Sequence, residues 1–370
     1  MEPSCELEYS SDLFPCSFHN FALGHKSIDL SMANSKASKK DISIHIKKRK
    51  PKPTNVYITY WKFAKERQDI FFKRLKGELP PWSNDAIFRD YKFTNVYRAC
   101  DRVSQYLIRN VIYDKDRQSA DAFFRIMLFK IFNRISTWEF IEGEVGEVNL
   151  RNYSFVTFNK LLKELLNANE RIYSAAYIMA SGKEAFGYER KHQNHLRLIE
   201  QMIETDLPNC IQECDSMQSA YDLLLTYPTI GGFLAYQYVT DINYSKLTNF
   251  TETEFVKAGP GARSGISKCF SDLGDFSPEN VIEMMADNQE SEFERLGLDF
   301  KTLFGRPLQL IDCQNVFCEV DKYSRAAHPE VSGESGRTRI KQKFKWEDKS
   351  SIDFFFPPKW KLNDKVKSYG

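Results

Sequence analysis

Apolar residues recur three and four positions apart along most of the chain, with Lys, Arg, Asp and Glu between them. This spacing places the apolar side chains on one face of a helix. Strand-like alternation is scarce, and no internal repeat is visible. The pattern predicts an all-α protein, with helices over residues 60–75, 93–107, 120–135, 153–166, 170–180, 188–204, 216–225, 277–296 and 309–325.

The helical pattern is confined to the middle of the chain. We predict one helical domain over residues 56–330, a disordered basic arm over residues 1–55 and a basic, aromatic tail over residues 331–370. The run of Lys and Arg near the end of the arm is most typical of a solvated tail. A phosphate-contacting arm and a nuclear-import signal are the alternatives. Basic residues alternate with aromatic ones in 337–346, which suits phosphate contacts with base stacking, or again a solvated tail.

Composition narrows the class of protein further. The 370 residues carry a formal net charge of +2, so overall charge does not indicate a partner. None of the eight Cys forms a CxxC pair and no apolar signal opens the chain, which favours reduced thiols in the cytoplasm, or in the nucleus of a eukaryotic host. No run of about 18 apolar residues occurs, so we expect no membrane span.

Two glycine-bearing turns lie between predicted helices. The first contains Gly231 and Gly232 and has the form of a helix-hairpin-helix, and the second contains Gly259, Gly261 and Arg263. A glycine turn that opens a helix presents unpaired N–H groups and the positive end of the helix dipole, which favour a phosphate. We predict that the first turn grips a DNA backbone and that the second holds a phosphate or pyrophosphate group.

The sequence lacks the residues that two common enzyme reactions require. In DNA glycosylases built on such a hairpin a catalytic Asp follows the hairpin, but residues 258–261 contain no carboxylate and Asp241 comes too early. Phe233 stands where a lyase would have Lys. Nothing matches the GxxxxGK[ST] phosphate loop. The sequence therefore argues against base excision and against a P-loop kinase.

Several segments together resemble a known family. They are residues 81–85, 91–98, 124–125, 132–133, 227–244, 259–262 and 314–323. In this order they resemble the helical domain of 5-hydroxymethyluracil DNA kinases, also described as the α-glutamyl/putrescinyl thymine pyrophosphorylase family. The basic arm and the tail lie outside the resemblance.

The resemblance implies a fold related to helix-hairpin-helix DNA glycosylases and action on 5-hydroxymethyluracil-derived thymine in DNA. The implied reaction is a transfer, in which an amine or amino acid displaces pyrophosphate from an activated pyrophosphoryloxymethyl uracil. The kinase of the family's name is then a pathway partner that makes the activated base. The expected enzyme is a transferase whose partners are DNA with a modified pyrimidine and an amine or amino-acid co-substrate.

The chemistry of such a transfer selects candidate residues by type. A carboxylate must deprotonate the amine, and the candidates are Asp241, Asp312, Glu319 and Asp321. Cations must stabilise pyrophosphate or bind DNA, and besides Arg263 the candidates are Arg98, Arg125, Lys322 and Arg325. Aromatic walls must hold an extruded base, and the candidates are Tyr97, Tyr236, Tyr244 and Tyr323. For each of them an ion pair, a helix cap or core packing is the structural alternative.

We expect no cofactor and no metal. His192 and His195 stand one helical turn apart, but no Cys or carboxylate completes a ligand set, so we predict a surface helix face there. Two other functions stay open at this point: a non-catalytic reader of modified DNA on the same fold, and a glycosylase-like enzyme that excises the base.

Overall fold

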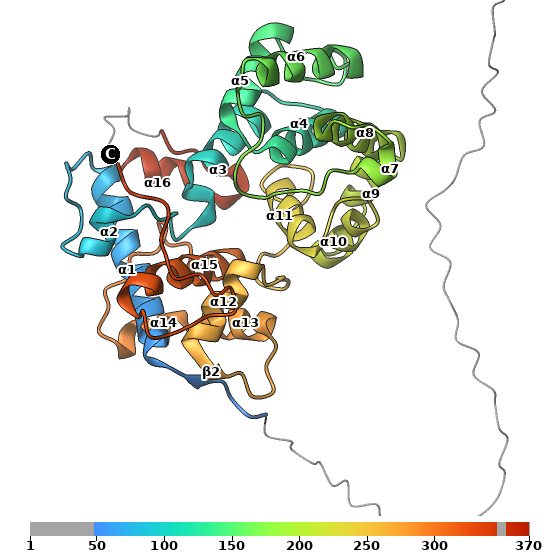
Figure 1. Ribbon diagram of the computed structural model, residues 1–370. Coiled ribbons are helices and arrows are strands. Elements are labelled where there is room, and N and C mark those ends of the chain that lie inside the picture. Colours follow the sequence, from blue (N-terminus) through green and yellow to red (C-terminus); the bar gives the residue numbers. More distant parts are fainter. Residues whose placement is uncertain (1–47, 346–352, 370) are drawn as a thin grey trace, which may run out of the picture. The chain divides into compact units, whose positions relative to one another are not determined.

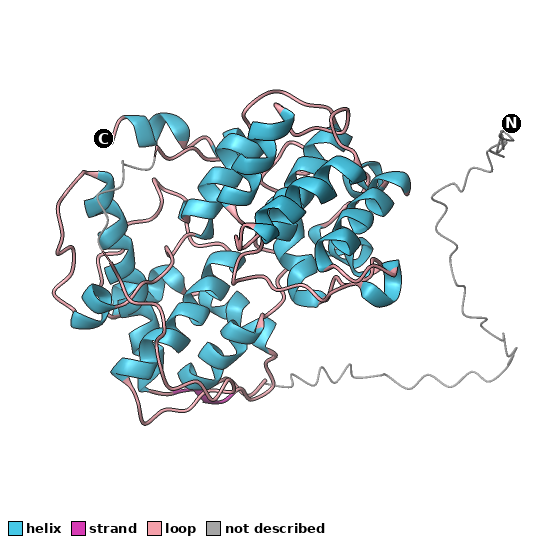
Figure 2. Ribbon diagram, turned by 45° about the horizontal axis from the view of Figure 1, so that its top comes forward, coloured by secondary structure: helices cyan, strands magenta, loops and turns pink. Residues whose placement is uncertain are grey.

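The structure is a computed structural model that describes residues 48–345 and 353–369. The chain divides into units at Met1–Lys47 and Lys48–Gly370, and all described residues belong to the second unit. That unit is mostly helical, which confirms the all-α prediction (Figures 1 and 2). Most of the predicted arm lies outside the described residues, and the division at residues 55 and 330 stays a prediction.

One group of helices packs around α15 (Leu310–Ala327), in the lower half of Figure 1. Its main members are α1 (Asn55–Leu75), α12 (Pro260–Cys269) and α13 (Pro278–Asp287). Also in the unit are α14 (Gln289–Arg295), α2 (Ala86–Asp90) and the antiparallel strands β1 (Lys52–Pro53) and β2 (Phe270–Asp272). Chain segments far apart in sequence thus form one helical group.

The second group packs around α4 (Ser119–Phe132). It contains α5 (Ile135–Val145), α6 (Phe155–Asn167), α8 (Lys191–Glu204), α9 (Leu207–Gln212), α10 (Met217–Leu225) and α11 (Gly232–Ile242). The 3-10 helix η1 (Arg98–Cys100), α3 (Arg102–Tyr106) and the π-helix η2 (Leu107–Ile112) precede it, and α7 (Lys183–Phe186) leads into α8.

Helix α4 runs through the core, as its nearly all-apolar sequence predicts. The ten consecutive residues from Phe123 to Phe132 are buried. Asn133 ends the helix in the left-handed conformation, at φ 49°, which short polar side chains tolerate better than others do. Two charged residues, Arg125 and Lys130, are enclosed with the apolar ones and need partners inside the protein.

Three helix predictions differ from the structure. Residues 170–180 form a loop instead of a helix, because Tyr177 takes a left-handed backbone conformation at φ 56° and turns its ring onto the core. The predicted helix over 93–107 begins only at Arg98, because Glu319 binds the N–H of Thr94 at 2.9 Å and holds the preceding segment extended. The predicted helix over 277–296 is two helices that meet at Asn288.

The described residues near the C-terminus pack against the helices. They include η3 (Pro358–Trp360) and α16 (Asn363–Lys367), and Phe356 before them is 0% exposed. The ammonium of Lys359 donates to the carbonyl oxygens of Ser245 and Thr248, at 3.1 and 2.7 Å. Trp346 of the predicted basic and aromatic segment lies outside the described residues.

Candidate functional site

A buried ion network centres on Asp241 of α11. Arg98 donates from Nη1 to one carboxylate oxygen at 2.7 Å and from Nη2 to the other at 3.0 Å. The ammonium of Lys130 lies 3.1 Å from the same carboxylate. Burial opposes the charge on Asp241, but Arg98 and Lys130 hold its pKa below the ordinary carboxyl value. Asp241 is thus an ionised, fully partnered carboxylate, which makes it a weak proton acceptor in this state.

Asp312 meets the same arginine from the start of α15. Its Oδ1 accepts from the backbone N–H of Arg98 at 2.8 Å, and its Oδ2 accepts from the N–H of Gln309 at 3.1 Å. The second bond is half of a capping box that begins α15. Burial raises the pKa of Asp312 to about 6. Arg98 therefore brings together two of the four predicted acids.

Glu319 lies farther along α15 in a separate ion pair. Its carboxylate is 2.6 Å from the ammonium of Lys322 and accepts from the backbone N–H of Thr94 at 2.9 Å. The Lys322 ammonium also lies 4.7 Å from the ring centre of Phe93. Glu319 and Lys322, both predicted as site residues, thus form an ion pair with each other, as their i, i+3 spacing on a helix allows.

Asp321 forms a third cluster, against α12. It accepts from the hydroxyl of Ser264 at 2.8 Å, lies 3.2 Å from the ammonium of Lys268 and pairs with Arg325. Burial opposes its charge, but Arg325, Ser264 and Lys268 together hold its pKa below the usual range. The structure therefore spreads the four predicted acids over three clusters and gives each one protein partners.

The first glycine turn joins α10 to α11, which pack against each other. Thr229 in this turn is left-handed at φ 68°, and Gly231 is the exposed N-cap of α11. The first N–H groups of a helix have no partner within the helix, so this end of α11 can accept an anion. That Gly231 and Gly232 of this turn contact a DNA backbone stays a prediction.

The second glycine turn already holds groups of the protein. Gly259, the N-cap of α12, donates its N–H to the side-chain oxygen of Gln314 at 3.1 Å. The carboxylate of Glu279 accepts from the N–H of Ala258 at 3.0 Å and from Arg263 at 3.3 Å. A carboxylate thus occupies the anion position predicted for phosphate, and a phosphate group would have to replace it.

The two turns meet at Phe233. A Cβ atom on Gly259 would lie 2.7 Å from two ring carbons of Phe233, so only glycine leaves room for the ring. A face of the Phe233 ring stacks on Tyr177, with ring centres 5.8 Å apart and planes within 7°. The Lys130 ammonium lies 4.6 Å from the Tyr177 ring centre. We call Phe233, Tyr177, Gly259 and Lys130 the Phe233 junction.

Arg125 is enclosed by the core. Its guanidinium donates to the carbonyl oxygens of Val111, Val148 and Asn110 and to Asp114, and its side chain is 0% exposed. It is therefore a structural residue in this fold, and the predicted phosphate contact has no access to it. Gly261 is likewise a packing position, because a Cβ there would lie 3.0 Å from Sγ of Cys318.

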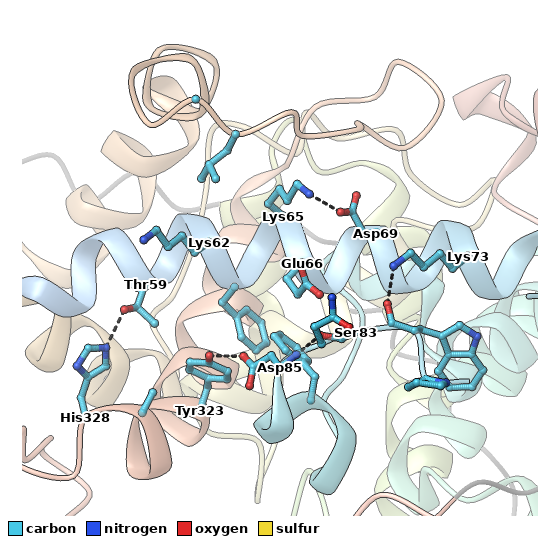
Figure 3. Close-up of a pocket in the computed structure, with 18 residues that line it drawn as sticks. Thr59, Lys62, Lys65, Glu66, Asp69, Lys73, Ser83, Asp85, Tyr323 and His328 are labelled. Atoms are coloured by element: carbon cyan, nitrogen blue, oxygen red, sulfur yellow. Dashed lines mark hydrogen bonds and ion pairs between the residues drawn. The ribbon is translucent and has the colours of Figure 1, made fainter. Parts of the chain in front are cut away.

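Three of the four predicted stacking tyrosines are also enclosed. Tyr97, Tyr236 and Tyr244 are each 1% exposed, and Tyr97 donates its hydroxyl to the carbonyl oxygen of Arg306 at 2.7 Å. Their rings pack inside the core, where a base has no access in this structure. Tyr323 differs because it lines a surface groove (Figure 3).

This groove runs along α1 and has a volume of about 720 Å³. α1 forms one wall, and the segment 81–88 and the end of α15 form the others. Figure 3 shows the ammonium groups of Lys62, Lys65 and Lys73 along the helix. These positions fall on one face of α1, and the first and last are separated by about 16 Å of helix. The volume is within the range of ligand pockets.

The far wall of the groove carries polar groups. Tyr323 donates its hydroxyl to Asp85 at 2.5 Å, and Asp85 also caps α2. His328 lies 2.8 Å from the hydroxyl of Thr59. The segment 81–85 and Tyr323 belong to the stretches that carry the family resemblance, and the structure brings them together here.

Sequence reasoning missed Lys130 and the three groove lysines. Burial lowers the pKa of Lys130 to about 8, and a single Lys within a run of apolar residues was its only signal in the sequence. The groove lysines had a clearer signal, because their spacing places them on one face of a helix.

Among residues 48–345 and 353–369, no group of three or more His, Cys, Asp or Glu residues is arranged to hold a metal ion. His192 and His195 are 2% and 0% exposed, so the predicted surface face is wrong: both rings are part of the core. Within the same residues, no helix combines the length and apolar character that a membrane crossing requires.

Comparisons with known proteins identify the family. A family model described as "5-hmdU DNA kinase, helical domain" matches residues 54–333. The 5-hmdU DNA kinase of Bacillus phage SP10 is 26% identical over 279 residues, which are 70% of this chain and 43% of that protein. The chain thus spans less than half the length of this relative, and no solved structure matches. Because the family model covers well over half of the 370 residues, the chain belongs to the family of the 5-hmdU DNA kinase helical domain.

Proposed function

We propose that this chain acts in DNA thymine hypermodification. It binds DNA that carries a 5-hydroxymethyluracil-derived base and transfers an amine or amino acid to that base. The amine nitrogen bonds to the exocyclic methylene carbon, and the bond from that carbon to oxygen breaks. Pyrophosphate leaves with the electron pair, and a carboxylate takes the amine proton.

The observation that carries the proposal is the Phe233 junction. The N-terminus of α11 and the α12 turn, whose anion position Glu279 holds in this structure, both lie against the ring of Phe233, beside the buried cations Arg98 and Lys130. A reaction that expels pyrophosphate from a base needs an aromatic surface for the base and cations or N–H groups for the leaving group. The junction has both within one cluster.

The groove along α1 supplies a second zone of contact. Lys62 and Lys73 are spaced to meet phosphates of the DNA that flanks the modified base, whereas Lys65 pairs with Asp69 of the same helix at 2.5 Å. Trp82 and Tyr323 offer aromatic surface. Lys62 is exposed on this face, and Lys73 is held in place by the carbonyl oxygen of Trp82 at 2.7 Å. The groove thus positions DNA while the junction receives the base.

The contacts of the four predicted acids with other protein groups favour a second function. Asp241, Asp312, Glu319 and Asp321 are all bound to protein groups, as a purely structural role requires. A non-catalytic reader of modified DNA on the same fold would show the same pairing.

One experiment separates these functions from each other. The chain is incubated with DNA containing 5-pyrophosphoryloxymethyluracil and a mixture of amines and amino acids, and released pyrophosphate and digested nucleosides are measured. A new nucleoside that forms together with pyrophosphate supports transfer, and binding without a product supports the reader. Abasic sites would indicate excision, and the absence of both binding and product would reject the proposed function. Lys160→Ala, at an exposed position on α6, serves as the control.

A further inference from the structure

We propose that Tyr177 occupies the site of an extruded pyrimidine base and that segment 174–178 moves aside when the base enters. The inference rests on the proposed function, because it names where the modified base binds. Tyr177 was not among the aromatic residues predicted from the sequence. It lies in the loop between α6 and α7 (Figure 1).

The surroundings of the Tyr177 ring are those that a pyrimidine requires. Phe233 stacks parallel to it, at 5.8 Å between ring centres. The Lys130 ammonium lies 4.6 Å from its ring centre, and that ammonium is bound to Asp241 and to Asn133 at 2.9 Å. A planar base in this position would stack on Phe233 and direct its carbonyl oxygens to a cationic donor.

The leaving group of such a base would find its own contacts next to the ring. Phe233 contacts Gly259 through the Cδ2–Cε2 edge of its ring, so the α12 turn with Arg263 lies next to the same aromatic ring. The exposed N-terminus of α11 begins one residue before Phe233. A diphosphate attached to the base therefore has the N-terminus of α11 within reach, and also the α12 turn once it replaces the Glu279 carboxylate there.

The segment that carries Tyr177 is anchored at both ends and little buried between them. Ile172 and Met179 are 3% and 4% exposed, whereas Ile178 is 75% exposed. Tyr177 has a left-handed backbone, at φ 56°, which is unfavourable for a residue with a bulky side chain and persists only while its ring is held. Release of the ring relieves that strain and leaves the anchors in the core.

The test compares Tyr177→Ala with Tyr173→Ala in the full chain. Tyr173 belongs to the same loop and stacks on Phe132, so its loss controls for a general loosening of the loop. The probe is the free base 5-hydroxymethyluracil, titrated by calorimetry. We expect Tyr177→Ala to bind the base roughly tenfold more tightly than the wild type. This gain follows if the Tyr177 ring is displaced in only about 10% of wild-type molecules, because only those molecules can bind the base. Lys130→Met added to Tyr177→Ala removes that gain.

Equal affinity of Tyr177→Ala and the wild type, with Tm showing both folded, overturns the inference. So does an equal gain in Tyr173→Ala. A second measurement compares the affinities for two duplexes, one with a single 5-hydroxymethyluracil:adenine pair and one with thymine:adenine at the same place. A stronger preference of Tyr177→Ala than of the wild type for the 5-hydroxymethyluracil duplex supports the inference. If the free base binds Tyr177→Ala as expected but no variant binds either duplex, the base site stands and the proposed action on DNA fails.

Discussion

Gly265 of α12 lies directly against the backbone of Phe317 on α15. A Cβ atom on Gly265 would overlap the carbonyl oxygen of Phe317 and lie 2.7 Å from its carbonyl carbon. The obstructing atoms belong to the main chain, which cannot move aside by changing a side-chain rotamer. Because α15 also carries Asp312 and Tyr323, this contact sets the position of both the ion network and the groove wall.

Gly265→Ala is therefore expected to destabilise the protein by about 1–3 kcal/mol, the range for overpacking a core. Urea unfolding followed by circular dichroism measures the change. The matched control is Gly143→Ala within α5, where an added Cβ meets nothing within 4 Å. There the helix preference of Ala should stabilise by roughly 0.5–1 kcal/mol. Equal unfolding midpoints for the two variants would contradict the close approach of α12 and α15.

The sequence predicted the fold well where a helix has a regular apolar face. α1, α4, α6 and α15 lie within a few residues of their predicted ranges, because burial of one face decides their structure locally. The loop at 168–182 was missed because contacts far away in the sequence outweigh its helical pattern. The ring of Tyr177 stacks on Phe233, more than fifty positions along the chain.

For the candidate site, the sequence supplied residue types and not their partners. It selected Asp241 as an acid, but the pairing with Arg98 and Lys130 depends on how three helical segments meet. It selected Gly259 for a turn that holds phosphate, but revealed neither the close approach of Gly259 to Phe233 nor the Glu279 carboxylate that occupies the anion position. Such pairings follow from packing, which periodicity alone does not reveal.

Stability should fall as pH drops from about 6.5 towards 4, partly through His195. The ring is 0% exposed, with Nε2 2.8 Å from the carbonyl oxygen of Ala180, and burial lowers its pKa to about 4. Between these pH values the unfolded chain binds more protons than the native one, so acid favours unfolding. In His195→Gln the slope of unfolding free energy against pH should decrease by up to about 1.4 kcal/mol per pH unit.

Urea titrations at half-unit pH steps measure this slope. His192, whose pKa burial also lowers to about 4, remains in the variant and should retain its own share of the acid sensitivity. An unchanged slope in His195→Gln would mean that His195 is protonated in the native protein.

The groove lysines should contribute to DNA affinity through counterion release. Lys62→Ala and Lys73→Ala are each expected to lower the slope of log affinity against log salt by about 0.9, the value for one lost phosphate contact. Fluorescence anisotropy with a duplex at several salt concentrations measures it. Lys160→Ala on α6, with its side chain 76% exposed, should leave the slope unchanged. An equal effect of all three substitutions would indicate general charge and not a groove.

Glu279 is expected to compete with pyrophosphate for the α12 turn. Its carboxylate accepts from the N–H of Ala258 and pairs with Arg263, so it holds the position that a diphosphate needs. Glu279→Gln keeps the side-chain shape and removes the repelling charge, which near a helix N-terminus is worth about 1 kcal/mol. We therefore expect roughly fivefold tighter binding of sodium pyrophosphate, measured by titration calorimetry. Glu283→Gln, on the same helix and held by Asn280 at 3.0 Å, should not change it. Weaker binding by Glu279→Gln would show that the carboxylate orders the turn for the anion instead of competing with it.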